Sequence, residues 1–316
     1  METLEILQSR IPRVTPGVSL AQYTTFGIGG PAEYFFETES DEDLRAALRA
    51  ARELSLPLTL IAGGSNIVAS NSGVAGLVVR IAHGEIRELH EFVLEADAGV
   101  LLGDLIEAAR RYGYAGLESL VGIPGTVGGA VFGNAGAYGR SVSEAIDTIR
   151  IFDGMDEREI SKKAGEFAYR TSIFKSEPWF ILSVRFCFSP GDPEALRERS
   201  EAVLAARLRN YKPDMRCPGS FFKNVLVRDL SLEVLDRIDQ SKVIEGKVPA
   251  GYLLDAVGAK GTVLGGLAVA QHHGNLILNT GDAKSDEVKA LAALLKQRVW
   301  ERFGIALEEE IRYIGS

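Results

Sequence analysis

The segment from 122 to 139 limits the possible folds of this chain more than any other, because seven of its eighteen residues are glycine. It reads GIPGTVGGAVFGNAGAYG. Glycine adopts positive φ and lets the backbone approach a ligand closely, and consecutive N–H groups can form a nest for diphosphate oxygens. The segment contains neither GxGxxG nor GxxxxGK[ST], which argues against a NAD-type Rossmann site and a P-loop. Tight turns alone rarely need so many glycines, so a phosphate-binding loop is the favoured interpretation.

A shorter glycine turn, Gly63-Gly64-Ser65-Asn66, follows an apolar run at 56–62 that predicts a buried strand. A turn at the end of a strand can also direct N–H groups at phosphate. Taken alone, this turn fits an ordinary structural connection better than a ligand loop. Without any other motif, the two glycine-rich loops say only that backbone holds a diphosphate.

Apolar periodicity predicts an α+β fold, since helical and strand patterns both occur and the chain has no repeats or low-complexity tracts. Ser40 is the expected N-cap of a helix through Leu54, with acidic residues in its first turn. Residues 306–314 alternate like a strand and, coming after a complete α+β unit, are expected to pair with an earlier domain. Further helices are predicted at 101–114, 191–210 and 285–303, and further strands at 32–37, 56–62, 76–81, 92–99, 145–153, 156–160 and 179–188.

Composition weighs against several classes of protein. A net charge of −8 is unfavourable for non-specific nucleic-acid binding, which needs a basic face. No apolar run approaches the ~18 residues of a membrane span, and we expect no signal peptide. Two separate cysteines and four histidines without ligand spacing predict a cytoplasmic protein with no metal site. One basic cluster is either a solvated helix end or a substrate-facing group, and it consists of Arg207, Arg209, Lys212 and Arg216.

Two short motifs carry residues suited to catalysis, and each also has a plain structural explanation. In YRTS (169–172), Arg170 is suited to bidentate pairing with a carboxylate or phosphate, or it simply ends a strand. In GSFFKN (219–224), Ser220 has neither a GxSxG elbow nor a nearby histidine, so a serine hydrolase is a poor interpretation. Its hydroxyl is able to donate a proton to a carbanion in a site that excludes water. The alternative for this motif is a hydrophobic turn.

The C-terminal motif LEEEIR (307–312) places Glu308, Glu310 and Arg312 on one face if the segment is a strand. Such a face is either a solvated edge or a catalytic acid held by a neighbouring charge. Spacing alone does not decide between these two interpretations.

Together, these motifs resemble one family in content and in order. They occur in the order seen in UDP-N-acetylenolpyruvoylglucosamine reductases, and the resemblance spans nearly the whole chain. The short span from Arg170 to Ser220 resembles the compact subtype of that family. The matching segments are TTFGIGGPAEYF (24–35), AGGSN (62–66), GIPGTVGGAVFGNAGAYG (122–139), YRTSIFK (169–175), GSFFKN (219–224), PAGYLLDAVGAKG (249–261) and LEEEIRYIG (307–315).

The resemblance implies the FAD-binding fold of p-cresol methylhydroxylase and vanillyl-alcohol oxidase, with two α+β subdomains followed by an α+β substrate domain. The expected subdomains are 1–85, joined by the C-terminal strand 304–316, and 86–200, and the expected substrate domain is 201–303. Both glycine-rich loops are implied to hold non-covalent FAD. The expected FAD-binding residues are Ala62, Gly63, Gly64, Ser65, Asn66, Ile67, Gly122, Ile123, Pro124, Gly125, Thr126, Gly128, Gly129, Ala130, Asn134, Gly136, Ala137 and Tyr138.

The same resemblance implies NADPH-dependent reduction of UDP-N-acetylglucosamine enolpyruvate to UDP-N-acetylmuramate in peptidoglycan synthesis. Hydride would pass from flavin N5 to C3 of the substrate, and Ser220 would protonate C2. Arg170 and a protonated Glu310 would stabilise the enediolate, through interactions that strengthen only as its charge develops. The remaining expected substrate contacts are Tyr169, Arg207, Lys223 and Asn224.

The chain departs from the family pattern at three places. Ala62 stands where the family often has a third glycine, and Val225 follows GSFFKN where proline is frequent. The QHH sequence (271–273) replaces a lysine followed by a single histidine. None of these departures touches Arg170, Ser220 or Glu310. One alternative is another FAD oxidase or dehydrogenase of the same fold. Many of those attach flavin covalently through histidine or cysteine, and neither glycine-rich loop contains either residue. The other alternative is a non-catalytic nucleotide-sugar sensor, which would be expected to lose one of the three catalytic positions.

Overall fold

The computed structural model describes residues 3–212 and 214–315. These residues form two compact units, each assembled from separate parts of the chain. Unit 1 comprises residues 3–18, 32–63 and 75–209, and unit 2 comprises 19–31, 64–74, 210–212 and 214–315. Within the described residues, the structure contains no helix that is long and apolar enough to cross a membrane.

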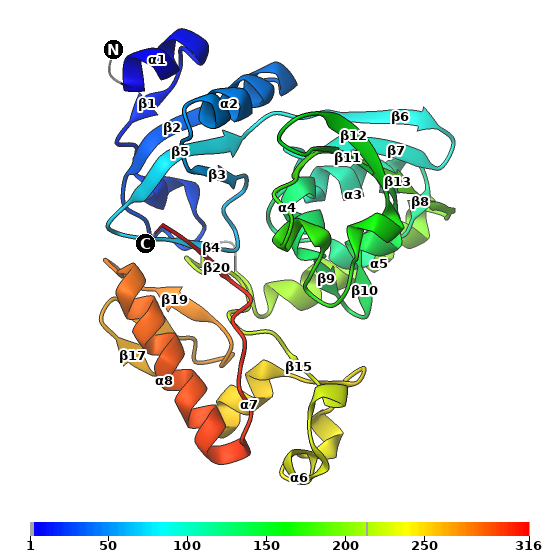
Figure 1. Ribbon diagram of the computed structural model, residues 1–316. Helices are drawn as coiled ribbons and strands as arrows, with labels where there is room; N and C mark the ends of the chain where they lie inside the picture. Colours follow the sequence, from blue (N-terminus) through cyan, green and yellow to red (C-terminus); the bar gives the residue numbers. More distant parts are fainter. Residues whose placement is uncertain (1–2, 213, 316) are drawn as a thin grey trace. The chain divides into compact units, whose positions relative to one another are not determined.

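The first part of unit 1 is a four-stranded sheet covered on one face by two helices (Figure 1). Helices α1 (Thr3–Arg10) and α2 (Asp41–Glu53) bury apolar side chains against the strands. Ser40 caps α2 as predicted, because its Oγ accepts the Asp43 N–H at 3.2 Å. The strands lie in the order β1 (Thr15–Pro16), β2 (Ala32–Thr38), β5 (Val74–Ile81), β3 (Leu58–Ile61).

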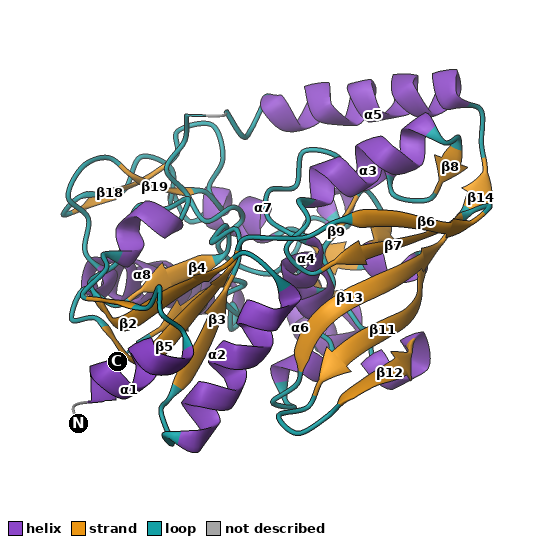
Figure 2. Cartoon of the chain, turned by 90° about the horizontal axis from the view of Figure 1, so that it is seen from above, coloured by secondary structure: helices purple, strands orange, loops and turns teal. Residues whose placement is uncertain are grey.

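The second part of unit 1 is a five-stranded antiparallel sheet with helices packed on it (Figure 2). Helices α3 (Leu102–Arg111) and α4 (Val127–Gly133) bury their apolar sides against the sheet, and α5 (Pro193–Leu208) lies beside α3. The strand order is β12 (Glu157–Ser161), β11 (Ile146–Phe152), β13 (Phe180–Cys187), β7 (Val93–Asp97), β6 (Ile86–His90). Two short pairs are β8 (Tyr114–Ala115) with β14 (Ser189–Pro190) and β9 (Gly136–Ala137) with β10 (Arg140–Ser141).

Unit 2 is built around α8 (Ser285–Phe303), whose Val288, Leu291 and Leu295 are fully buried. Phe221 and Phe222 belong to the same hydrophobic cluster. The other helices are α6 (Leu232–Leu235) and α7 (Ala250–Ala256). The strands pair as β17 (Val263–Leu264), β18 (Leu267–Val269) and β19 (Ile277–Asn279), as β15 (Val225–Leu226) with β16 (Lys247–Val248), and as β20 (Arg312–Ile314) parallel to β4 (Ile67–Ala69).

The predicted α+β class is confirmed, and so are the helices expected at 40–54, 101–114, 191–210 and 285–303, within a few residues. The strand predicted over 306–314 is wrong for 306–311. Regular pairing there is confined to β20, and Glu309 makes only an isolated bridge to Phe222. Residues 304–311 are an extended connection with single main-chain bonds, and such a connection alternates polar and apolar residues as a strand does. The shared face expected for three charged residues of this motif therefore does not follow from strand geometry.

Candidate functional site

The two glycine-rich loops meet within unit 1 at Gly63 and Gly125. A Cβ built on Gly63 would lie 2.8 Å from the Gly125 Cα, which is closer than a side chain can approach. Gly125 has a φ of +111°, a conformation that favours glycine. Only main chain fits at this contact, so position 63 requires glycine.

Helix α4 begins directly after this contact. Thr126 is its N-cap, and the Thr126 Oγ1 accepts the Gly129 N–H at 3.3 Å. The Gly128 N–H donates to the Ala98 carbonyl at 2.9 Å, and a Cβ on Gly128 would lie 2.8 Å from the Ala98 Cβ. Gly128 is therefore glycine because α4 packs closely on the connection before α3, and its N–H is already bonded within the protein.

Arg170 lies at the tip of a tight turn whose ends, Ala168 and Thr171, exchange two backbone hydrogen bonds of 3.2 Å. Its φ is +55°, a left-handed conformation that costs a residue other than glycine about 1 kcal/mol. The guanidinium lies over the Tyr169 ring, with 5.5 Å between the Arg170 Cζ and the ring centroid. Lys175 donates its Nζ–H to the Arg170 carbonyl at 2.6 Å. The strained residue is thus held by contacts on both sides of its turn.

The Arg170 turn, residues 168–171, is also bonded to the glycine-rich segment. The Asn134 Nδ2 donates to the Ala168 carbonyl at 2.8 Å, and the Ser172 Oγ donates to the Phe132 carbonyl at 2.7 Å. Asn134 and Ser172 are both buried, so losing either bond would leave a polar group without a partner in the protein interior. Two motifs that are separate in sequence therefore form one structural element in unit 1.

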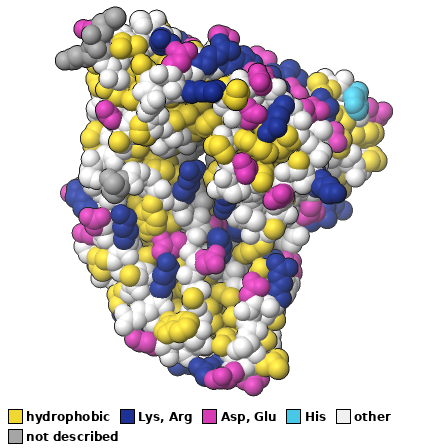
Figure 3. Space-filling model, in the orientation of Figure 1, with side chains coloured by type: hydrophobic (Ala, Val, Ile, Leu, Met, Phe, Trp, Pro, Cys, Tyr) yellow, Lys and Arg dark blue, Asp and Glu magenta, His cyan; other side chains and the backbone are white. Residues whose placement is uncertain are grey.

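The predicted basic cluster is divided between the two units. In unit 1, Arg207 packs over the start of the glycine-rich segment, since a Cβ on Gly122 would lie 3.4 Å from the Arg207 Cδ. In unit 2, Arg216 donates from Nη2 to the Gly27 carbonyl at 3.2 Å and from Nη1 to the Gly281 carbonyl at 3.4 Å. Arg216 thus fixes loops of its own unit. On the face shown in Figure 3, basic and acidic side chains of the described residues are interspersed rather than gathered in one basic field.

Within unit 2, the main chain of Glu310 is held between two of the predicted motifs. Its N–H donates to the Phe221 carbonyl at 2.8 Å, and its carbonyl accepts the Asn66 Nδ2–H at 3.1 Å. Arg312 donates its N–H to the Asn66 carbonyl at 2.9 Å. The first glycine turn, the GSFF segment and the C-terminal connection are thereby assembled together. Gly64 belongs to this assembly, with a φ of +60° and space for no Cβ, which would lie 1.8 Å from the Tyr23 carbonyl oxygen.

Ser220 comes directly before the buried residues Phe221 and Phe222, and the Asn275 side chain bonds both main-chain groups of Phe222. The Asn275 Oδ1 accepts the Phe222 N–H at 2.8 Å, and its Nδ2 donates to the Phe222 carbonyl at 2.8 Å. The Ser220 Oγ lies 2.8 Å from the Tyr211 Oη. Neither Asn275 nor Tyr211 is among the predicted site residues. Asn275 belongs to no recognised pattern, although an asparagine beside the apolar run LIL is a signal of a buried polar contact, and Tyr211 is an uncharged residue inside the basic cluster.

The other predicted substrate contacts of unit 2 have partners within the protein. Lys223 forms an ion pair with Glu308, with 2.8 Å between Nζ and Oε2. The Asn224 Oδ1 accepts the Ala250 N–H at 3.0 Å, at the start of α7. Substrate binding by Lys223 and Asn224 stays a prediction. It requires that these side chains bind the substrate in place of, or in addition to, Glu308 and the Ala250 N–H.

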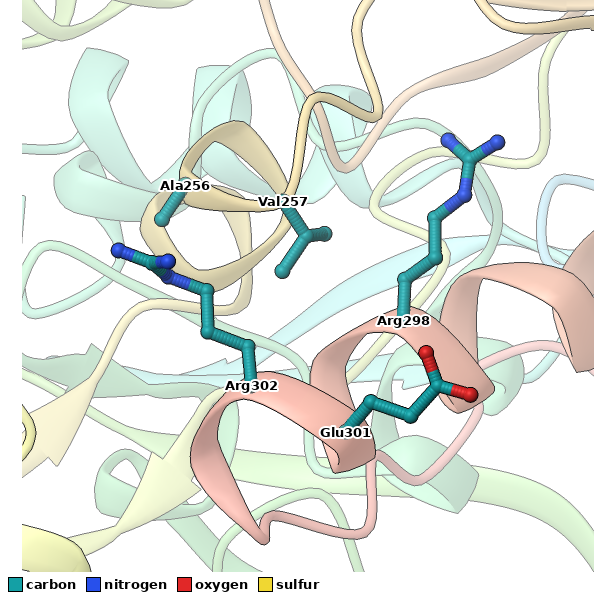
Figure 4. Close-up of a pocket in the computed structure, with 5 residues that line it drawn as sticks. All are labelled: Ala256, Val257, Arg298, Glu301 and Arg302. Carbon is teal, nitrogen blue, oxygen red and sulfur yellow. The ribbon is translucent and has the colours of Figure 1, made fainter.

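Unit 2 also has an open depression of about 550 Å³ between α7 and α8 (Figure 4). Arg298 and Arg302 extend from successive turns of α8, past Val257. None of the predicted site residues lines this depression, so it is separate from the geometry described above. In the described part of the chain, no group of three or more His, Cys, Asp or Glu side chains is arranged to hold a metal ion.

The glycine-rich loops fit a flavin dinucleotide. At Gly63 the two loops lie too close together for a Cβ, and positive φ at Gly64, Gly122 and Gly125 turns peptide groups of both loops in directions that other residues rarely allow. Neither loop contains histidine or cysteine, so the donor set suits non-covalent binding.

Comparisons with known proteins agree with this geometry. The FAD binding domain family matches residues 32–157, and the family described as UDP-N-acetylenolpyruvoylglucosamine reductase, C-terminal domain, matches residues 212–314. A UDP-N-acetylenolpyruvoylglucosamine reductase of Solibacter usitatus is 45% identical, over 96% of this chain and 97% of its own length. The corresponding protein of Rubrobacter xylanophilus is 35% identical, over 98% of each chain.

A solved structure is also similar over nearly the whole chain. The crystal structure of UDP-N-acetylenolpyruvylglucosamine reductase from Thermus caldophilus matches with a TM-score of 0.76 and 30% identity, over 96% of this chain and 99% of the other. The chain therefore has the FAD-binding fold of the p-cresol methylhydroxylase and vanillyl-alcohol oxidase type, followed by a C-terminal domain specific to these reductases. On this evidence, the chain belongs to the UDP-N-acetylenolpyruvoylglucosamine reductase family of FAD-dependent oxidoreductases.

Proposed function

We propose that this protein uses NADPH to reduce UDP-N-acetylglucosamine enolpyruvate to UDP-N-acetylmuramate, a step of peptidoglycan synthesis. The observation that carries the proposal is the similarity to named reductases along nearly the whole chain. It is supported by the presence of Arg170, Ser220 and Glu310, each held by specific contacts of its own unit. A non-catalytic nucleotide-sugar sensor has no need to keep all three. The expected cytoplasmic location stays a prediction.

FAD would be held by residues 62–67 and by the segment 122–138, which includes α4, with its diphosphate against main-chain N–H groups. When bound, the flavin would carry hydride from NADPH to carbon C3 of the enolpyruvyl group. The match of residues 32–157 to the FAD binding domain family supports this assignment, because that span contains both segments.

Arg170 would stabilise the charge that develops on the substrate carboxylate as C3 gains hydride. A guanidinium pairs with both carboxylate oxygens at once, and its position on a strained, externally held turn keeps it pre-organised. Glu310 would donate a hydrogen bond to the same enediolate, for which its carboxyl must carry a proton. Both interactions would be stronger in the transition state than in the bound substrate, which is the condition for raising the rate.

Ser220 would complete the reaction by giving its hydroxyl proton to C2. Its side chain is half-buried and follows Gly219, whose φ of +84° and open surroundings turn the chain towards the buried phenylalanines. Asn275 then fixes the main chain two residues further on. The serine is therefore placed by rigid neighbours on its C-terminal side, as a proton donor to a defined carbon requires.

A second function within the same fold is oxidation of an alcohol or sugar by FAD. The absence of histidine and cysteine from both glycine-rich loops disfavours the covalent flavin found in many such enzymes. The two functions differ in their electron acceptor, because an oxidase passes electrons to oxygen and the proposed reductase passes them to the enolpyruvyl sugar.

The experiment is to purify the protein and follow NADPH oxidation with and without the enolpyruvyl UDP-sugar. We expect a yellow protein whose flavin is released by denaturation, and NADPH oxidation that depends on the sugar. Rapid NADPH consumption with oxygen and none with the sugar would overturn the proposed function. Flavin that stays with the denatured precipitate would overturn non-covalent binding.

A further inference from the structure

We propose that Tyr211 is a positioning residue for Ser220, which holds the serine hydroxyl by a hydrogen bond and returns a proton to it after each transfer. The inference rests on the proposed function, in which Ser220 protonates C2. It adds a residue that neither the glycine-rich loops nor the three catalytic positions include.

The observation is the contact between the two hydroxyls. The Tyr211 Oη and the Ser220 Oγ are 2.8 Å apart, the usual length of an O–H···O hydrogen bond. Serine has a single hydroxyl proton, and that proton must point at the substrate carbon when Ser220 acts as an acid. The hydrogen bond therefore runs from Tyr211 to the serine oxygen. It fixes the rotation of the serine side chain and leaves its proton directed away from the tyrosine.

The same bond stabilises the charge that develops on Ser220. As the new C2–H bond forms, the serine O–H bond breaks and its electron pair stays on the oxygen. The tyrosine proton then moves to that oxygen, and the phenolate takes up the one solvent proton that reduction by NADPH consumes overall, so protons and charge balance over the cycle. A phenol has a pKa of about 10, several units below that of an aliphatic alcohol, so this transfer is downhill. Tyr211 is half-buried, so part of this residue is in contact with solvent.

One segment, 271–275, holds both members of the pair. His272 donates from Nε2 to the Asn210 carbonyl at 2.9 Å, directly before Tyr211. Asn275 holds Phe222, and its carbonyl accepts the Phe221 N–H at 3.0 Å, directly after Ser220. The tyrosine and the serine are therefore set relative to each other by a common anchor within unit 2. This gives a role to the QHH sequence (271–273), where the chain departs from the family pattern.

The test is a double-mutant cycle on the full-length holoenzyme with Tyr211→Phe, Ser220→Ala and both together. Flavin is reduced with NADPH without oxygen and mixed in a stopped-flow instrument with the enolpyruvyl UDP-sugar. We expect Tyr211→Phe to slow flavin reoxidation at least ~10-fold in the Ser220 protein and to add no further slowing in the Ser220→Ala protein. Reduction of the flavin by NADPH should keep its rate in Tyr211→Phe.

The matched control is Tyr252→Phe, which removes another tyrosine hydroxyl of unit 2. That hydroxyl accepts the Asp239 N–H at 3.2 Å, and both half-reactions should keep their rates. Wild-type reoxidation in Tyr211→Phe, or the same slowing in both serine backgrounds, would overturn the inference. The inference would also be overturned if Tyr211→Phe slowed both half-reactions equally and melted at a lower temperature than Tyr252→Phe. Wild-type enzyme whose reduced flavin is not reoxidised by the sugar would instead overturn the proposed function, without reference to any variant.

Discussion

The Arg170 turn in unit 1 and the Glu310 segment in unit 2 hold their key side chains in opposite ways. Arg170 is held by local conformation, with a φ of +55° and bonds to residues no more than 40 positions away. Glu310 is held by its main chain between Phe221 and Asn66, which lies 244 positions earlier in the chain. Unit 1 therefore depends on glycines and strained dihedrals, whereas unit 2 depends on a few polar bonds between distant segments.

The largest expected effect is that of Asn275→Ala in unit 2. The substitution leaves the N–H and the carbonyl of buried Phe222 without their partners, at a cost of about 3 kcal/mol for the pair. Ser220 should lose its position as well. Chemical unfolding measures the loss of stability. The control is Thr280→Ala, which removes an exposed hydrogen bond to the Gly266 carbonyl. We expect the stability of this control to lie within ~0.5 kcal/mol of the parent. Equal effects of the two changes would show that unit 2 does not depend on this buried amide.

Gly63→Ala tests the corresponding dependence of unit 1 on close backbone contact. The new Cβ would lie 2.8 Å from the Gly125 Cα, so the loops must separate, at a cost of about 2 kcal/mol and with a loss of bound flavin. Gly133→Ala is the matched control in the same unit, because a Cβ there has nothing within 4 Å. We expect Gly133→Ala to keep its flavin and its stability. Flavin content and thermal unfolding distinguish the two, and loss of flavin from both would mean that the glycines act by flexibility rather than by space.

Asp41, the first residue of α2, adds a pH-dependent contact to unit 1. Its hydrogen bond with His83, together with the charges of Arg150 and Arg45, outweighs burial and lowers the pKa of Asp41 from 3.8 to about 2. The folded-state pKa lies below the unfolded value, so the stabilisation is present above pH ~4 and is lost as the pH falls towards 2. After allowance for solvent screening it amounts to about 1 kcal/mol.

The test is the pH dependence of unfolding for Asp41→Asn. The variant should be less stable than the parent at neutral pH and should converge with it near pH 2. Asp286→Asn, at a side chain that is 92% exposed, is the control and should follow the parent throughout. A constant difference between Asp41→Asn and the parent at every pH would contradict the assignment.

Arg170→Gly should give the smallest change in stability and the sharpest separation of stability from activity. Glycine relieves about 1 kcal/mol of left-handed strain in the folded state. It also raises the conformational entropy of the unfolded chain, which lowers the stability by roughly half of that amount. We therefore expect a net gain in stability of about 0.5 kcal/mol. Arg170→Ala lacks this gain, and both variants should lose sugar reduction. A destabilised Arg170→Gly protein would show that the arginine holds the turn instead of being held by it.

Sequence patterns predicted the elements that depend on local chemistry. Ser40 and the acidic residues after it mark the start of α2, and apolar spacing marks α8 to its last residue. The glycine-rich segment is recognisable because close backbone contact and positive φ restrict the residue type itself. Even so, its pattern does not show that the Gly128 N–H is bonded to Ala98.

Contacts between distant segments could not be predicted in the same way. The connection at 306–311 alternates like a strand, yet only its partners at 66 and 221–223 define its path. Asn275 and Tyr211 are common residue types whose importance comes from what lies next to them after folding. The apolar run after Asn275 indicates that it is buried, but no local pattern shows that it bonds to Phe222 or that Tyr211 contacts Ser220.

The proposed function requires that electrons pass from NADPH through bound flavin to the enolpyruvyl sugar. The most direct measurement is to reduce the flavin anaerobically with NADPH, remove the excess and add the sugar while recording absorbance near ~450 nm. We predict that the oxidised flavin spectrum returns and that one UDP-N-acetylmuramate forms per flavin. Flavin that stays reduced with the sugar and is reoxidised only when oxygen is admitted would contradict the account.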